Sequence, residues 1–488
     1  MDYRHFSSDR GSDPDDGGRA ISSSPLSARD SAQMDRNPSP PPDLDGAESG
    51  EEGDAIGETV YSKHWLFSTL TRLVQSVTEQ EGGDQESQVE LSEEEEEELC
   101  KIWDMAMDKD VAGFLQEFKA PDILLGVIAK SRSPRLTEIC VGILGNMACF
   151  PNTCLTLSQN EDLGAVLLLL LGDADPPTLL ETCRLLLTCL SQSDVAPLWL
   201  ERVRQQKSVY PNLCFIMCSS TNTDLLVKVG ELVDKLFDLD EDLMKSWITA
   251  QPSEVDPDSQ IHISTSLLEA TKQLRTESLD SLEVYLHAIQ LLTTVDEGVQ
   301  LFLAEGEGLG KEAWNVLKEL VCQDLCQMDD PPVILQEQKG LLAPALAVLS
   351  TLFPRYGQQG GDVEQNLPLI GSLLRVLQYL QVCQQRETGN HTDSEVSKDE
   401  EEEEEDVQLQ ALKETTAEFL ASVLIDLTKG AMAELVKRGS LTAQTCLLVA
   451  NSLLPQHRAA VDHMTAALSE EEPKLVDVLK GKLPAARP

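Results

Sequence analysis

The chain has 488 residues, of which 41% are hydrophobic and only 4% aromatic, and its formal net charge is −46. A chain of this length can bury a large core, and a composition rich in leucine and poor in aromatics favours stacked helices over sheets. The negative charge repels phosphate backbones and anionic lipid, which argues against direct binding to nucleic acid or to a membrane surface. It favours protein partners that have basic segments.

The charge is concentrated in two segments of low complexity. Residues 1–98 carry a net charge of −18 and residues 386–406 a net charge of −9, which is more than half of the total. Residues 1–59 are rich in Ser, Pro, Gly, Asp and Glu and cannot bury enough apolar area to offset their ordering entropy. We therefore predict that 1–59 is disordered and that 386–407 is a disordered acidic loop, with 483–488 as a short tail.

The sequence predicts a soluble, intracellular, monomeric protein. The N-terminus lacks the apolar stretch of a signal peptide, and the longest apolar run, Ala165–Leu171, is far short of the roughly 20 residues that span a bilayer. The twelve cysteines are scattered through apolar stretches. That pattern is typical of reduced thiols that pack as small hydrophobes in the cytosol or nucleus.

Residues 60–109 are predicted to hold N-terminal helices joined by an acidic linker. An amphipathic helix is expected over 62–78, and its apolar stripe comprises Leu66, Leu70, Leu73, Val74 and Val77. Ser92 and Glu95 have the spacing of a capping box, and the glutamates of 93–98 suit the first turns of the helix that follows.

An internal repeat dominates residues 110–237. Four positions of one helix recur 43 residues later with the same or a similar residue, namely Glu138, Cys140, Leu144 and Met147 against Glu181, Cys183, Leu187 and Leu190. Ser133–Pro134 and Asp175–Pro176 mark the two helix starts, because a capping side chain precedes a proline at the first helical position. This interval is typical of armadillo repeats, which have three helices in roughly 40–45 residues.

The repeat predicts the helices of three successive units. We assign them to 110–118, 121–131 and 134–148, then 151–159, 162–171 and 176–191, then 194–206, 210–219 and 222–237. Further helices are expected over 312–328, 333–352 and 367–385, so that repeats fill 110–385, and a last helical segment occupies 408–482. The predicted fold is all-α, a right-handed helical solenoid of armadillo/HEAT type.

Several stretches resemble one small family, the serum amyloid A-like proteins, which are also described as synoviocyte-proliferation-associated proteins. The resemblance is carried by TVYSKHWLF (59–67), IWDMAMDKDVAGFLQEFKAPDILLGV (102–127), EICVGILGNMACF (138–150), DPPTLLETCRLLLTCLSQ (175–192), TDLLVKVGELVDKLFDLDE (223–241), QLLTTVDEG (290–298) and DDPPVILQEQK (329–339). It implies an armadillo-type fold, a largely nuclear location and a role in fibroblast proliferation under inflammatory stimulus, with no enzymatic activity. It runs from about residue 34, so residues 1–33 are expected to lie outside the family pattern.

Asn146 is the candidate peptide-binding residue. Armadillo proteins that hold extended peptides use an asparagine on the third helix of each repeat, and an amide side chain both donates to and accepts from a peptide bond. Asn146 lies at that position, but Cys189 stands 43 residues later and Gly142 replaces the tryptophan expected one turn earlier. The alternative is a polar residue that stabilises the helix.

The sequence shows no recognisable catalytic, cofactor or metal site. Two cysteine pairs, Cys214/Cys218 and Cys322/Cys326, could share a helix face, but zinc would need two further ligands, so we interpret them as core cysteines. His287 has no nucleophile or orienting carboxylate in a known motif. Phosphate-binding, dinucleotide-binding, hydrolase and kinase signatures are also missing. We expect no enzymatic activity and no cofactor.

Three serines are candidate phosphorylation sites. Ser92 and Ser397 precede acidic residues, as an acid-directed kinase requires, and Ser39 precedes a proline. The acidic run 400–406 is interpreted either as a solvated spacer or as a docking site for basic segments.

These features lead to two functional hypotheses. The first is a protein-interaction scaffold in nucleus and cytoplasm that recruits partners with basic segments and, by the resemblance, promotes fibroblast proliferation. The alternative is a nucleocytoplasmic carrier or chaperone for basic cargo, which repeated asparagines on third helices would have favoured.

Overall fold

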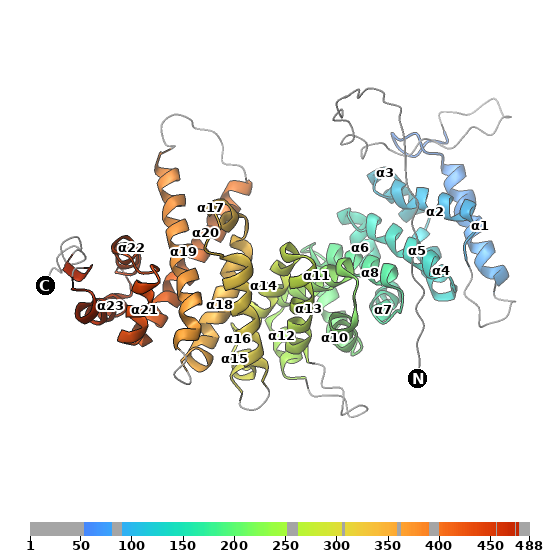
Figure 1. The fold of residues 1–488 in the computed structure, drawn as a ribbon. Helices are drawn as coiled ribbons and strands as arrows, with labels where there is room; N and C mark the ends of the chain where they lie inside the picture. Colours follow the sequence, from blue (N-terminus) through green and yellow to red (C-terminus); the bar gives the residue numbers. More distant parts are fainter. Residues whose placement is uncertain are drawn as a thin grey trace, which may run out of the picture. The chain divides into compact units, whose positions relative to one another are not determined.

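The computed structural model describes residues 53–80, 90–250, 262–304, 308–358, 363–389, 400–454, 456–473 and 475–477. These residues form helices joined by short turns (Figure 1), and the one β-type pairing among them is an isolated bridge between Ala55 and Ser62. The prediction of an all-α fold is confirmed.

An ordered turn precedes the first helix and corrects the boundary of the segment predicted as disordered. Within 53–62, Ile56 and Tyr61 are buried, and the bridge closes the turn. Asp54 accepts hydrogen bonds from the hydroxyl of Ser62 and, over 2.9 Å, from the backbone N–H of His64. Two apolar anchors and one capping carboxylate therefore order residues whose composition is otherwise polar. Most of the predicted interval, 1–52, lies outside the described residues.

The first two helices are α1 (Lys63–Gln80) and α2 (Glu93–Met105). The capping box is confirmed, because Ser92 accepts from the N–H of Glu95 while the Glu95 side chain accepts from the N–H of Ser92. Of the apolar stripe predicted for α1, Val74 is an exception, since it is 42% exposed.

The three predicted repeat units are present, with boundaries within two residues of those expected. They comprise α3 (Lys109–Glu117), α4 (Ala120–Lys130) and α5 (Pro134–Met147); α6 (Pro151–Gln159), α7 (Glu161–Leu170) and α8 (Pro176–Leu190); and α9 (Ala196–Gln205), α10 (Val209–Ser219) and α11 (Thr223–Leu239). Ser133 and Asp175 cap α5 and α8 as predicted, each with proline at the next position.

In the described part of the chain, twelve further α-helices follow, together with a 3-10 helix (Leu279–Leu282) and a π-helix (Leu320–Leu325). They are α12 (Glu241–Ile248), α13 (Ile263–Glu277), α14 (Glu283–Leu292), α15 (Asp296–Leu303), α16 (Leu309–Glu319), α17 (Pro332–Glu337), α18 (Lys339–Tyr356), α19 (Val363–Gly389), α20 (Glu400–Asp426), α21 (Lys429–Lys437), α22 (Ala443–Leu453) and α23 (Arg458–Glu471). The interval 386–407, predicted as a loop, begins and ends in helix, because α19 continues to Gly389 and α20 starts at Glu400. Residues 390–399 and 478–488 lie outside the described part.

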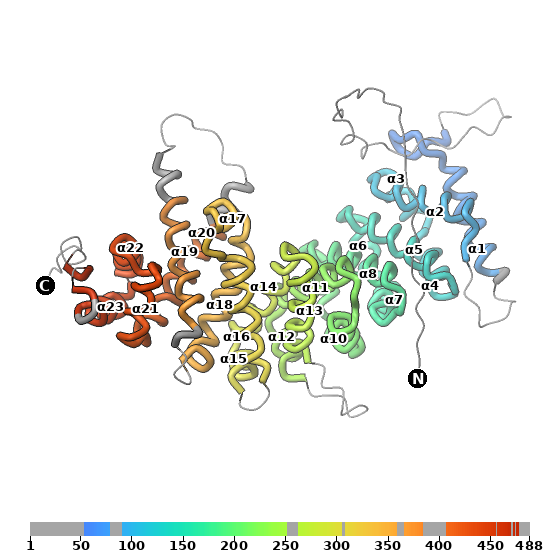
Figure 2. Tube along the Cα trace, in the orientation of Figure 1, coloured from blue at the N-terminus to red at the C-terminus, as the bar shows by residue number. Residues whose placement is uncertain are grey.

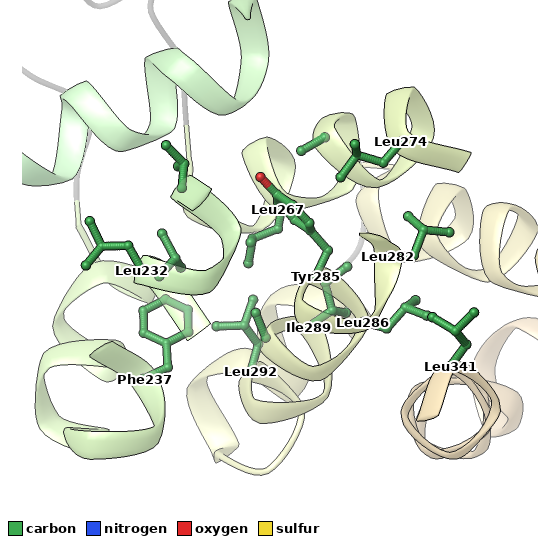
Figure 3. Packing of buried hydrophobic residues seen from close by; sticks show 14 of the residues in the cluster. Leu232, Phe237, Leu267, Leu274, Leu282, Tyr285, Leu286, Ile289, Leu292 and Leu341 are labelled. Atoms are coloured by element: carbon green, nitrogen blue, oxygen red, sulfur yellow. The ribbon is translucent and has the colours of Figure 1, made fainter. Parts of the chain in front are cut away.

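One helix from each unit packs against its counterpart in the next. The series runs α2, α5, α8, α11, α14, α18, α20 and α23, each in contact with the one before (Figure 2). We call these the third helices. The third helices and the helices beside them share one apolar core, of which Figure 3 shows Leu232 and Phe237 of α11, Leu267 of α13 and Tyr285 of α14.

Hydrogen bonds between α5 and α8 repeat the sequence period. Thr178 donates to the carbonyl oxygen of Pro134, and Gln192 donates to that of Ala148 over 2.6 Å. Both bonds join residues 44 positions apart, close to the 43-residue repeat, so they hold the two helices in matching register. The repeat does not make every equivalent pair alike, since Leu144 is fully buried whereas Leu187 is only partly buried.

Candidate protein-interaction surface

The third helices α5, α8, α11, α14 and α18 are buried on most sides, and each leaves one stripe partly exposed. In α8, for example, three residues are half-buried, namely Arg184, Leu187 and Thr188. The residues beside them, such as Cys183 and Leu185, are buried. Helix positions three or four apart share a face, so each stripe follows its helix. Contacts of Arg135 with Glu96, of Arg184 with Gly142 and of His287 with Asp234 join stripes of neighbouring helices. We call the polar part of this surface the third-helix face, and it comprises Glu96, Trp103, Arg135, Glu138, Arg184, Lys228, Glu231, Asp234, Glu283 and His287.

Ion pairs connect the face across α2 and α5. Arg135 of α5 donates through Nε to Oε1 of Glu96 of α2 over 2.8 Å, and its NH1 lies 2.8 Å from Oε1 of Glu138. The Arg135 and Glu96 side chains are each 40% exposed, so the pair is screened by solvent and contributes little to stability. It does fix the direction in which both side chains point.

Glycines in α5 make room for side chains of its two neighbours. A Cβ atom on Gly142 would lie 2.2 Å from a ring carbon of Trp103, and one on Gly145 would lie 2.9 Å from NH2 of Arg184. Arg184 also donates to the carbonyl oxygen of Gly142 over 3.2 Å and pairs with Glu181 over 2.6 Å. Trp103 and Arg184 therefore lie against α5 with their outer surfaces half-exposed.

Asn146, the candidate peptide-binding residue, lies in the contact between α2 and α5. The residue is 7% exposed, and Nδ2 donates to the carbonyl oxygen of Trp103 over 2.7 Å. The amide nitrogen therefore serves the packing of α2 on α5, and peptide binding by Asn146 stays a prediction. The alternative interpretation, a polar residue that stabilises the helices, agrees with this geometry.

A histidine–aspartate pair occupies the face between α11 and α14. Nδ1 of His287 lies 2.7 Å from Oδ1 of Asp234, and the imidazole is 42% exposed. The hydrogen bond to Asp234 raises the pKa of His287, against the opposing effect of burial, and the charges of Asp238 and Glu283 add to the increase. Sequence reasoning missed this carboxylate because it precedes the histidine by 53 residues and belongs to another helix.

The cysteines are less uniformly buried than predicted. Cys214 and Cys326 are buried and Cys322 is partly buried, but Cys218 is exposed and lies 3.3 Å from the Ser266 hydroxyl. A pair that the sequence did not indicate is Cys154 with Cys189, whose Sγ atoms are 3.8 Å apart inside the core. Within the described ranges no group of three or more His, Cys, Asp and Glu side chains is arranged to hold a metal ion.

Of the candidate phosphorylation sites, Ser92 is exposed at the start of α2, where its hydroxyl serves the capping box. Ser39 and Ser397 lie outside the described residues.

Comparison with known proteins identifies the family. Residues 209–461 match the family model described as the SAAL1 C-terminal domain. Protein saal1 of Danio rerio is 59% identical to this chain, and the match covers 97% of each. The chain belongs to the SAAL1 family. Protein SAAL1 of Homo sapiens is 49% identical and matches 93% of this chain and 99% of its own length.

The SAAL1 match also corrects one expectation about residues 1–33. The Danio rerio relative leaves about 3% of this chain unmatched, which is fewer than 33 residues, so part of that segment is shared with a SAAL1 relative.

Among solved structures, an engineered protein is similar to this SAAL1-family chain with a TM-score of 0.41 and 13% identity, over 85% of this chain and 92% of its own. Importin beta is similar with a TM-score of 0.21 and 11% identity, over 84% of this chain and 64% of its own. In the described part of the SAAL1-family chain, no helix has both the length and the apolar character needed to cross a membrane.

Proposed function

We propose that this SAAL1-family chain is a non-enzymatic protein-interaction scaffold, and that it binds segments of partner proteins on the third-helix face. The observation that carries the proposal is the continuity of this face, in which half-exposed charged side chains follow one another across α2, α5, α8, α11 and α14. Stacked repeats with such an extended surface suit the binding of long or multiple protein segments.

The charge of the face supports a preference for basic segments. It presents five carboxylates (Glu96, Glu138, Glu231, Asp234 and Glu283) and three permanent cations (Arg135, Arg184 and Lys228), and the buried carboxylate of Glu181 pairs with Arg184. Because each of these three cations is already paired with a carboxylate, an incoming segment meets the excess negative charge. Attraction of this kind increases the association rate and excludes acidic partners.

We further propose that the scaffold acts in nucleus and cytoplasm and promotes fibroblast proliferation under inflammatory stimulus, as the family resemblance implies.

The surroundings of the His287–Asp234 pair support a binding role rather than catalysis. The pair is partly exposed and lies near the carboxylates of Asp238 and Glu283, so it adds charge to a surface that a partner can contact.

Charge reversal on the face tests the proposal. The full-length chain and a Glu231→Arg, Glu283→Arg double variant would each be used to capture proteins from nuclear extracts of dividing fibroblasts, with quantification by mass spectrometry. We expect the captured proteins with basic segments to fall at least fivefold for the variant. The control is an Asp162→Arg, Glu201→Arg double variant, which changes the net charge equally at exposed positions of α7 and α9. Equal capture by both variants would contradict the proposal.

A further inference from the structure

A concave site lies outside the third-helix face, between α19, α20 and α22. It is a pocket of about 400 Å³, a volume that accepts one or two side chains of a ligand. Its floor is apolar and consists of Leu377 and Leu380 of α19 and Leu448 of α22, all of which are buried. The floor therefore suits an aliphatic side chain of a ligand and gives no reason to expect an ion.

The rim of this pocket is nearly all neutral. It carries four exposed amide side chains, Gln381, Gln410, Asn451 and Gln456. An amide side chain offers both donors and an acceptor, which are the groups that a peptide main chain requires. The only charged side chains of the lining are Lys413 and Glu414, and their charges offset one another. We call this site the amide-rimmed pocket.

The chain that forms one wall of the pocket also carries the densest acidic run of the described helices. Residues 400–406, six glutamates and one aspartate, are the first residues of α20, and the run ends four residues before Gln410. A ligand in the pocket thus lies near seven consecutive acidic residues of the same helix. A run of negative charge at this density attracts cationic side chains.

We propose that the amide-rimmed pocket binds an extended peptide segment of a partner protein, with a leucine-sized side chain on the apolar floor and lysine or arginine residues beside it. The amides hydrogen-bond to the peptide main chain, and the acidic run of α20 attracts the basic residues. The inference rests on the proposed scaffold role, but it concerns another surface, so either site can fail without the other.

The test uses the full-length chain and three fluorescein-labelled peptides, with binding followed by fluorescence anisotropy. The first peptide is Ser-Lys-Lys-Ser-Leu-Ser-Lys-Lys-Ser, the second has alanine in place of leucine, and the third has glutamine in place of every lysine. We expect saturable binding of the first peptide and at least tenfold weaker binding of each of the others. No saturable binding of the first peptide, or equal binding of the alanine peptide, would overturn the proposal.

Matched variants locate the binding. Asn451→Trp fills the mouth of the pocket and should weaken binding of the first peptide at least tenfold, whereas Gln444→Trp, at an exposed position of α22 outside the lining, should leave it unchanged. Replacing the six glutamates of 400–405 with glutamine should weaken binding and reduce its dependence on salt. Wild-type affinity in Asn451→Trp overturns the proposal. The Glu231→Arg, Glu283→Arg variant should bind the peptide normally, which separates this site from the third-helix face.

Discussion

The side-chain amide of Asn146 donates a hydrogen bond to the carbonyl oxygen of Trp103, 43 residues earlier in the chain. This separation equals the repeat interval found in the sequence, so the bond joins equivalent levels of the neighbouring helices α2 and α5. Asn146 has the residue type and repeat position of a peptide-binding asparagine, and in this structure its side chain joins one unit to the next.

Replacing Asn146 with alanine should lower the free energy of unfolding by about 1–3 kcal/mol, because the substitution leaves the part-buried carbonyl of Trp103 without this partner. Chemical denaturation of the full-length chain measures the change. Asn152→Ala, at an exposed position of α6, is the control and should change stability by less than about 0.5 kcal/mol. Wild-type stability of the Asn146 variant would show that the hydrogen bond is not formed in solution.

Two glycine-to-alanine substitutions should have opposite effects. At Gly142 the added methyl group meets the Trp103 ring, and overpacking of this kind typically costs about 1–3 kcal/mol. At Gly113 of α3 no atom lies within 4 Å of the added Cβ, so alanine should stabilise the helix by roughly 0.5–1 kcal/mol. Thermal unfolding measures both changes, and the tryptophan fluorescence of the Gly142 variant should also shift. A change in stability of the same direction for both variants would contradict the packing of Trp103 on α5.

Leu144 and Leu187 occupy equivalent positions of the repeat but should differ in their contribution to stability. Leu144→Ala should cost about 2–5 kcal/mol, since it opens a cavity in a closed core. Leu187→Ala should cost about 1 kcal/mol, because its half-buried side chain gains less from leaving water. Parallel denaturant titrations compare the two variants. Equal losses would mean that Leu187 is covered in solution.

The His287–Asp234 pair should make a pH-dependent contribution to stability. The pKa of His287 in the folded chain is raised above the ordinary value of about 6.5, so the pair stabilises the fold fully below that pH. The contribution is lost as pH rises through the folded pKa. Asp234→Asn should return the pKa of His287 toward its ordinary value, as followed by NMR titration of the imidazole. Asp238→Asn, which removes only a more distant charge, should lower it less, and an unchanged pKa in Asp234→Asn would contradict the pairing.

Local signals in the sequence determined the helices of the repeat region. A capping side chain followed by proline marks the starts of α5 and α8, and apolar residues at helical spacing mark their buried sides. These signals act within a few residues of one another, so they can be read without knowing the fold. The 43-residue interval then predicted which helices are equivalent.

Only the tertiary structure decided which side chains of different helices meet on the exposed stripes. His287 meets Asp234, Arg184 lies on the glycines of α5, and Asn146 turns inward to Trp103, each through a contact between residues more than 35 positions apart. The amide-rimmed pocket likewise gathers side chains from three helices. The composition of one helix does not specify which side chain of another will reach it, because that depends on the rotation and offset of the packed helices. Helical periodicity therefore predicts the stack, whereas the packing of unit on unit creates its surfaces.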